Sequence, residues 1–306
     1  MQSLQKILQS RAFIVATRRN SFALTTKTKP DHFAMRNKII FSHIPKTAGT
    51  SILSLLNSNY PKTRRIGCYP STTEKHFDVI TKMPFLNVIA THCQFGCHAA
   101  FGWPAQYFSF LRHPVDQVVS NFSHLQRRGF DHEMPPHMSL EQFLKSEDGN
   151  NLQTVYFSGI NQTDSRFKED PQKVLEIAKS NMERFYFFIG ITERYSESAF
   201  MLSKILRWRI LKIEHKNANK TRPAVISREI RQLIENKCCL DMQLYEYGKK
   251  KFDENFRSFR TEFSQMKRSL PQHVVVSNRI KNILLSRWDS IQSRYLRITS
   301  KMRQQT

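Results

Sequence analysis

Short apolar runs recur along the chain and have the character of buried β-strands. They cover residues 38–44, 86–91, 107–111 and 185–191. Each run is shorter than eight residues, contains β-branched or aromatic residues, and is followed by polar residues, which favours strands over helices. The pattern therefore predicts four strands.

Between these runs, apolar residues recur every three or four positions, which predicts amphipathic helices. Three predicted helices cover residues 50–60, 195–208 and 226–247. Two more begin at Pro114 and Pro171, because proline suits the first helical turn. Strands separated by helices predict an α/β fold with a mainly parallel central sheet flanked by helices.

The N-terminal end of the chain differs from this central part. Residues 1–29 contain six Lys or Arg and no Asp or Glu. Residues 1–35 are therefore predicted to be a basic, disordered leader. The same composition is typical of a mitochondrial-type transit peptide, and a third interpretation is an upstream start that precedes Met35.

The C-terminal end is also basic. Residues 264–306 contain nine Lys or Arg and a single acid, Asp289, with apolar residues at helical spacing. Residues 263–306 are therefore predicted to form a basic amphipathic helical tail. Such a tail either packs on the domain or makes a peripheral contact with a membrane surface or polyanion.

The chain of 306 residues carries a net charge of +23, and a field of this sign attracts polyanions. Nucleic acids, anionic membranes, sulfated or uronate sugars and phosphorylated small molecules all qualify. We expect no specific nucleic-acid partner, because no helix-turn-helix, zinc-finger or RNA-recognition signature is present. We also expect no transmembrane span, because the chain has no run of about 20 apolar residues.

The segment KIIFSHIPKTAGTSILSLL, residues 38–56, runs from a predicted strand through small residues into a predicted helix. Backbone N–H groups and the helix dipole favour an anion at such a helix start. The segment is not a Walker A loop, in which the lysine follows the second glycine. A phosphate cradle and a turn that uses Thr, Gly and Ser only for capping both fit this spacing.

Two blocks of sequence resemble a known family. HIPKTAGTS at 43–51 resembles the 5′-phosphosulfate loop of sulfotransferases that use 3′-phosphoadenosine 5′-phosphosulfate (PAPS), and FLRHPVDQVVS at 110–120 resembles their 3′-phosphate motif. Weaker blocks lie at 91–96, 151–159, 187–198 and 240–252. The resemblance is closest to the carbohydrate branch with heparan sulfate 2-O-sulfotransferase and uronyl 2-O-sulfotransferase. It implies a single P-loop-like sulfotransferase domain at residues 36–262.

The resemblance also implies site residues and a mechanism of in-line sulfuryl transfer from PAPS, with no metal. His92 would be the general base, and Lys46 would neutralise the charge on the departing phosphate oxygen. The 5′-phosphosulfate would be held by Lys46, Thr47, Ala48, Gly49, Thr50 and Ser51, the 3′-phosphate by Arg112 and Ser120, and the cofactor would be covered by Lys220 and Thr221.

The positive charge and the resemblance together imply an anionic carbohydrate acceptor. A family-like protein would be cytoplasmic or Golgi-lumenal, whereas the leader composition points to mitochondria. The sequence does not decide the compartment, the oligomeric state or the hydroxyl that is sulfated.

Other interpretations remain open from the residues alone. Zinc could be bound by His92, Cys93, Cys97 and His98, although no second tight Cys/His cluster accompanies them. Whether Cys93 and Cys97 pair is also open. The alternative function is non-enzymatic binding of a heparin-like polymer or nucleic acid, which would explain the charge but not the two ordered motifs.

Overall fold

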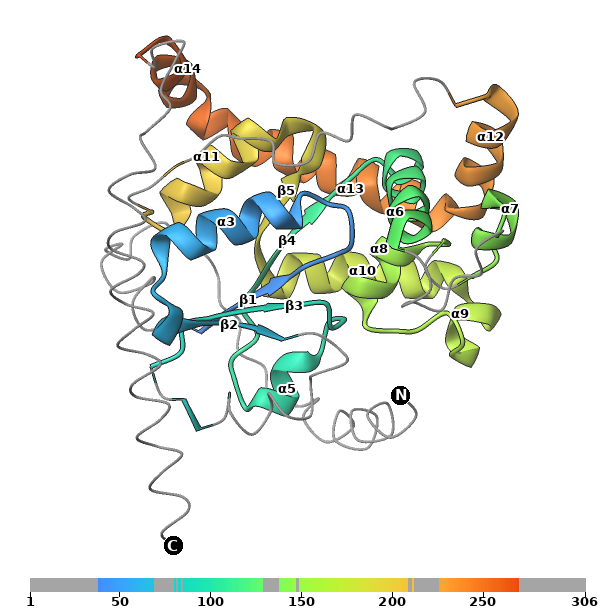
Figure 1. Cartoon of the computed structure of the whole chain (residues 1–306), viewed down its shortest axis with the longest axis horizontal. Coiled ribbons are helices and arrows are strands. Elements are labelled where there is room, and N and C mark those ends of the chain that lie inside the picture. The colour runs from blue at the N-terminus through green and yellow to red at the C-terminus, as the bar shows by residue number, and fades with distance from the viewer. Residues whose placement is uncertain are drawn as a thin grey trace, which may run out of the picture. The chain divides into compact units, whose positions relative to one another are not determined.

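The computed structural model describes residues 38–68, 80, 82–83, 85–128, 138–146, 149–208, 211 and 226–269. The chain divides into two compact units, Met1–Phe259 and Arg260–Thr306. Figure 1 shows the strands at the centre of the first unit with helices around them.

The first unit is built on a parallel sheet. Its strands are β1 (Ile39–Ser42), β2 (Arg65–Cys68), β3 (Val88–Thr91), β4 (Tyr107–Leu111) and β5 (Tyr186–Ile191). Their order across the sheet is β2-β3-β1-β4-β5, and every neighbouring pair is parallel. The predicted α/β class with a mainly parallel central sheet is therefore confirmed.

The strand order reverses at the centre of the sheet. From β1 the chain continues to β2 and β3 on one side, and then crosses to β4 and β5 on the other. The carboxyl ends of β1 and β4, which lie at this reversal, lead into helices, and open α/β sheets bind ligands at such a switch point. These helices are α3 (Gly49–Asn59) and α6 (Pro114–Arg128).

The other helices of this unit connect the strands and follow the last one. They are α5 (Cys97–Phe101), α7 (Leu140–Phe143), α8 (Leu152–Ser158), α9 (Ser165–Glu169), α10 (Pro171–Phe185), α11 (Tyr195–Ile205), α12 (Arg228–Lys237) and α13 (Cys239–Phe256). Short 3-10 turns lie at η2 (Lys62–Arg64), η5 (Thr192–Arg194) and η6 (Arg257–Phe259). Helix α10 begins as predicted, with Asp170 accepting from the Lys173 N–H and Pro171 in the first turn.

Several elements differ from the sequence prediction, which did not include the short helices α5, α7, α8 and α9. Strand β2 was not predicted, because its four residues, RIGC, form no apolar run. The single helix predicted at 226–247 is two helices, α12 and α13, which meet at Cys238.

The break at Cys238 is held by a residue from a distant part of the chain. Asn151, directly before α8, donates from Nδ2 to Lys237 O at 3.0 Å. Its Oδ1 accepts from the N–H groups of Leu240 and Asp241 at 3.0 and 3.1 Å. The side-chain amide of Asn151 thus pairs with a backbone carbonyl at the end of α12 and with two backbone N–H groups at the start of α13.

Helix α13 returns this contact. The buried carboxyl of Asp241 accepts from the N–H of Gln153 at 3.0 Å and from the N–H of Thr154 at 2.7 Å. It also accepts from Thr154 Oγ1 at 2.6 Å. The first turns of α8 and α13 therefore cap one another, because each supplies the acceptor that the other helix start lacks.

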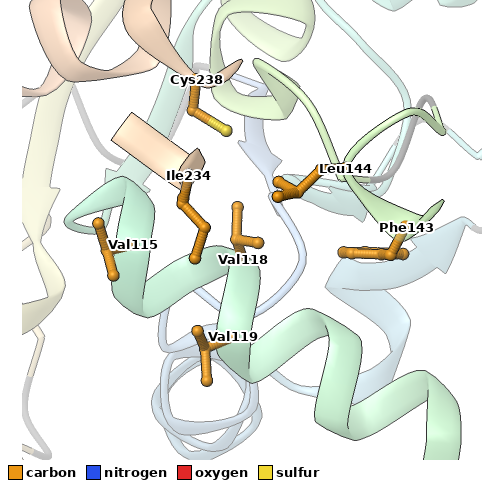
Figure 2. Packing of buried hydrophobic residues seen from close by; sticks show 7 residues of the cluster. All are labelled: Val115, Val118, Val119, Phe143, Leu144, Ile234 and Cys238. Atoms are coloured by element: carbon orange, nitrogen blue, oxygen red, sulfur yellow. The ribbon is translucent and has the colours of Figure 1, made fainter. Parts of the chain in front are cut away.

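Helix α6 packs against α12 and α7 through a set of buried apolar side chains. The set consists of Val115, Val118, Val119, Phe143, Leu144, Ile234 and Cys238. Figure 2 shows Val118 between Ile234 and Leu144, so the valine face of α6 joins both neighbouring helices. This packing fixes α6, whose first turn follows the end of β4.

The second unit begins with helix α14 (Arg260–Ser269), so the predicted tail is helical at its start. The rest of the tail and the predicted leader lie outside the described residues. Within the part of the chain that the structure describes, every helix is too short or too polar to cross a membrane.

The Asp241 carboxyl gives a stability prediction. Burial raises its pKa to about 6. The hydrogen bonds from Thr154 and Gln153 lower the pKa and offset only part of this rise. Between about pH 4 and 6 this carboxyl therefore binds more protons in the native state than in the unfolded state. Its contribution to the free energy of unfolding falls as the pH rises through this range. We expect the stability of the wild type relative to Asp241→Asn to fall by roughly 2 kcal/mol across this range. Urea unfolding at several pH values measures this difference.

Asp164→Asn is the control for this measurement. The hydrogen bond from Arg166 lowers the pKa of Asp164, so the advantage of the wild type over this variant should be lost as pH falls, not as it rises. A wild-type advantage over Asp241→Asn that stays constant with pH would contradict an ionising buried carboxyl.

Candidate functional site

The loop between β1 and α3, residues 43–48, is held by two side chains from the second motif. Gln117 Nε2 donates to Pro45 O at 3.1 Å. Arg112 Nη1 donates to Lys46 O at 2.9 Å. The two sequence blocks are therefore in direct contact, and the second fixes the shape of the first.

The loop also contains backbone strain. Lys46 and Ala48 have φ angles of 67° and 65°, a left-handed conformation that costs a non-glycine residue on the order of 1 kcal/mol. Between them, buried Thr47 donates from Oγ1 to Ile44 O at 2.9 Å, so its hydroxyl stabilises the loop itself. Strain of this kind persists where the surroundings hold it and is common at binding sites.

Helix α3 begins without a capping side chain. Its N-cap residue is Ala48, and its first turn contains no acidic residue. The first helical bonds run from the N–H groups of Ser51 and Ile52 to Ala48 O, at 3.0 and 3.2 Å. The N–H groups of Gly49 and Thr50 therefore have no acceptor within the helix, and they lie at its positive end. This end of α3 suits an anion.

Gly49 is required by the close approach of His43. A Cβ at position 49 would lie 1.5 Å from His43 Nε2. The His43 ring also stacks on Phe41, with 5.3 Å between centroids. Burial lowers the pKa of His43 to about 3, and the nearby charges of His92 and Lys46 contribute in the same direction. His43 is therefore a neutral ring that supports the turn beneath the helix start.

His92 lies beside this loop. It follows Thr91 at the end of β3, as His43 follows Ser42 at the end of β1, and the two strand ends are paired in register. The centroids of the two imidazoles are 4.2 Å apart. The fold therefore brings a second imidazole next to the loop that leads into the uncapped start of α3.

Arg112 directly follows β4, and its backbone is held on both sides. Its N–H donates to Gln153 Oε1 at 3.0 Å, and Gln153 Nε2 donates to Arg112 O at 2.8 Å. The N–H of the next residue, His113, donates to Glu193 Oε1 at 2.9 Å. The guanidinium is thus carried by a fixed backbone and directed to the loop at Lys46 O.

Ser120 lies in α6, one helical turn after Gln117. Residues three apart lie on the same side of a helix, so Ser120 is on the side of α6 that contacts the loop. Its side chain is partly buried. Lys220 and Thr221, the remaining predicted contacts, lie outside the described residues.

Three functional neighbours were not predicted from the sequence. Gln117, Gln153 and Glu193 contact the loops from partners 72, 41 and 80 residues away in the chain. Their positions in the sequence follow no spacing that would mark them as residues of a site. The only hint was that all three lie within blocks of the family resemblance, Gln117 in the block 110–120, Gln153 in 151–159 and Glu193 in 187–198.

The segment with two cysteines and two histidines has no metal geometry. Among the described residues, no three His, Cys, Asp or Glu side chains are placed to hold a metal ion. Cys93 and Cys97 are free thiols, and Cys97 Sγ lies 3.5 Å from the hydroxyl of Tyr107 in the interior. Burial raises the pKa of the Cys97 thiol. The zinc interpretation therefore has no support from the described part of the chain.

Together these elements place cationic side chains, an uncapped helix start and an imidazole at the carboxyl edge of the sheet. Lys46, Arg112 and the uncapped start of α3 can bind an anion with more than one charged group. His92 adds a group that can accept a proton.

Comparison with known proteins identifies relatives among carbohydrate sulfotransferases. Human galactose-3-O-sulfotransferase 2 is 24% identical over 237 residues, which are 68% of this chain and 58% of that protein. Human heparan-sulfate 6-O-sulfotransferase 2 is 25% identical over 190 residues, which are 52% of this chain and 31% of that protein. The matched region is thus less than two thirds of the length of these relatives. A sulfotransferase from Alicyclobacillus acidocaldarius matches in structure at 13% identity over 69% of this chain and 95% of that one, with a TM-score of 0.42.

These relatives confirm the carbohydrate sulfotransferase resemblance and do not support its 2-O-sulfotransferase branch. A model of the galactose-3-O-sulfotransferase family matches residues 16–267. This match starts within the predicted leader and covers both motifs of the site. Because it includes most of the sequence, the chain belongs to the galactose-3-O-sulfotransferase family.

Proposed function

We propose that this chain transfers a sulfuryl group from PAPS to a hydroxyl of a carbohydrate. The observation that carries the proposal is the hydrogen bond from Arg112 Nη1 to Lys46 O. It joins two cationic residues and the uncapped start of α3 at one edge of the sheet. Membership of a family of sulfotransferases supports the reaction class.

The donor set fits the anionic groups of PAPS. The 5′-phosphosulfate suits the N–H groups of Gly49 and Thr50 together with Lys46, because a helix start and a mobile cation both favour negative charge. The separate 3′-phosphate suits the forked guanidinium of Arg112 and the hydroxyl of Ser120. Further predicted contacts are Thr47, Ala48, Ser51, Lys220 and Thr221.

PAPS, when bound, supplies the sulfuryl group, and residues of the chain handle charge and proton. We assign Lys46 to the phosphate oxygen on which negative charge grows as the sulfuryl group departs. We assign His92 as the base that removes the proton of the attacking hydroxyl. The neutral state of His43 suits this role of its neighbour, because a charged ring there would disfavour proton uptake by His92.

We further propose an anionic glycan as the acceptor. The named relatives act on galactose and on heparan sulfate, so both sugar classes are candidates. The net charge of +23 favours the anionic one, because a positive field concentrates a polyanion near the protein.

The same charge supports a second candidate, a non-enzymatic binder of heparin-like polymers. This candidate needs neither a nucleotide site nor a base. A measurement of nucleotide binding therefore distinguishes the two candidate functions.

The nucleotide site is tested by calorimetric titration of the full chain with 3′-phosphoadenosine 5′-phosphate (PAP), the product nucleotide. We expect micromolar binding by the wild type. Arg112→Ala and Lys46→Ala should each weaken it about 10- to 100-fold, because each removes a charge-assisted contact to a phosphate.

Arg166→Ala is the charge-matched control, because Arg166 is an exposed residue of α9 that pairs with Asp164. Its affinity for PAP should equal that of the wild type. Equal weakening by Arg112→Ala and Arg166→Ala would indicate unspecific charge attraction. A folded chain that binds heparin but not PAP would support the second candidate.

The base is tested by transfer of radiolabelled sulfate from PAPS to a β-galactoside oligosaccharide and to de-O-sulfated heparin. His92→Ala should lower the transfer rate by roughly 10²- to 10⁴-fold, the usual effect of losing a general base. Its affinity for PAP should change little, since the proposed role of His92 concerns the acceptor.

His98→Gln provides the histidine control. His98 bonds through Nδ1 to the hydroxyl of Tyr107, the first residue of β4, and so lies at the opposite end of that strand from Arg112. Its transfer rate should stay within about twofold of the wild type, because the substitution is remote from the reacting groups. Equal rates in His92→Ala and the wild type would remove His92 as the base.

A further inference from the structure

The backbone of Arg112 is held by a side chain that the two sequence motifs do not contain. Gln153 accepts from the N–H of Arg112 at 3.0 Å and donates to its carbonyl oxygen at 2.8 Å. Two bonds exchanged with one residue are what a neighbouring antiparallel strand would provide. The amide of Gln153 thus continues the pairing of β4 by one residue beyond Leu111, where the strand ends.

Gln153 is itself fixed. Its side chain is fully buried, so water does not compete for the amide. Its backbone N–H donates to the Asp241 carboxyl at 3.0 Å, and the next residue, Thr154, adds two further bonds to the same carboxyl. The backbone that carries the amide is therefore anchored through α8 to α13, and burial limits the space in which the amide can move.

Because Gln153 holds the backbone of Arg112, it also limits where the guanidinium of that residue can lie. Arg112 has a long side chain that loses rotational freedom when it binds a phosphate. Its far end is restrained at Lys46 O, and its near end is restrained by the amide of Gln153. With both ends restrained, the guanidinium is oriented before a ligand arrives, which lowers the entropic cost of binding.

We propose that Gln153 is a positioning residue that aims Arg112 at the 3′-phosphate of the nucleotide. The proposal rests on the proposed function, because it takes Arg112 as the 3′-phosphate contact. It adds a residue that touches neither nucleotide nor acceptor and yet determines how well the site distinguishes nucleotides with a 3′-phosphate from those without.

The test compares PAP with adenosine 5′-phosphate, which lacks the 3′-phosphate, by calorimetry on the full chain. The quantity measured is the ratio of the two dissociation constants. Gln153→Met keeps the length of the side chain and removes both hydrogen bonds, and we expect it to reduce the preference for PAP by roughly tenfold. Gln153→Asn keeps an amide that is too short to bond both groups, so it should also reduce the preference and is the milder change for folding.

Thr154→Val is the matched control, because Thr154 bonds to the same Asp241 carboxyl but not to Arg112. It should lower the melting temperature while leaving the preference for PAP within about twofold of the wild type, since the N–H bonds of Gln153 and Thr154 to Asp241 remain and still hold the start of α8. This separates positioning from a general loss of stability.

An unchanged preference in both folded Gln153 variants would overturn the proposal, and so would an equal loss of preference in Thr154→Val. Failure of the proposed function looks different. In that case the wild type itself would bind PAP no better than adenosine 5′-phosphate, and the inference would fall with it.

Discussion

The first turns of α8 and α13 cap one another, and the candidate site depends on that contact. Asn151 satisfies the start of α13, and Asp241 satisfies the start of α8. A buried helix end without such partners would be costly, so the two helices are held in one register. The register places Gln153 against the backbone of Arg112, and Arg112 in turn holds Lys46 O. The mutual cap is thus connected to the loop after β1 through Gln153 and Arg112.

The loop itself shows why such support is needed. Two non-glycine residues, Lys46 and Ala48, have left-handed backbone angles, and α3 starts with no capping side chain. Both features cost stability in the free protein. Bonds from Arg112 and Gln117 and the packed ring of His43 offset part of this cost. The result is an uncapped helix start on a supported loop, which the proposed reaction would use to bind an anionic group.

Burial helps to determine which side chains at the site carry a charge. His43 and His92 lie with ring centroids 4.2 Å apart, but the low pKa of His43 keeps its ring neutral. The cations at the loop are therefore Lys46 and Arg112, which we propose to face the two ends of one nucleotide. We propose His92, whose ring lies beside the neutral ring of His43, as the group that accepts the proton of the acceptor hydroxyl.

The sequence alone determined the elements whose signal is local. Four strands followed from apolar runs, and the start of α10 followed from Asp170 and Pro171. The loop at 43–51 was singled out by its residue types and order, and Arg112 by the resemblance of its block to a known family, and their role in binding a nucleotide stays a prediction. Strand β2 was missed because its residues form no apolar run and it becomes a strand only by pairing with β3. The break between α12 and α13 and the role of Gln153 were decided by the tertiary structure, because both depend on hydrogen bonds from residues 41 to 90 positions away. Such partners leave no periodicity in the chain, since the fold alone brings them within bonding distance.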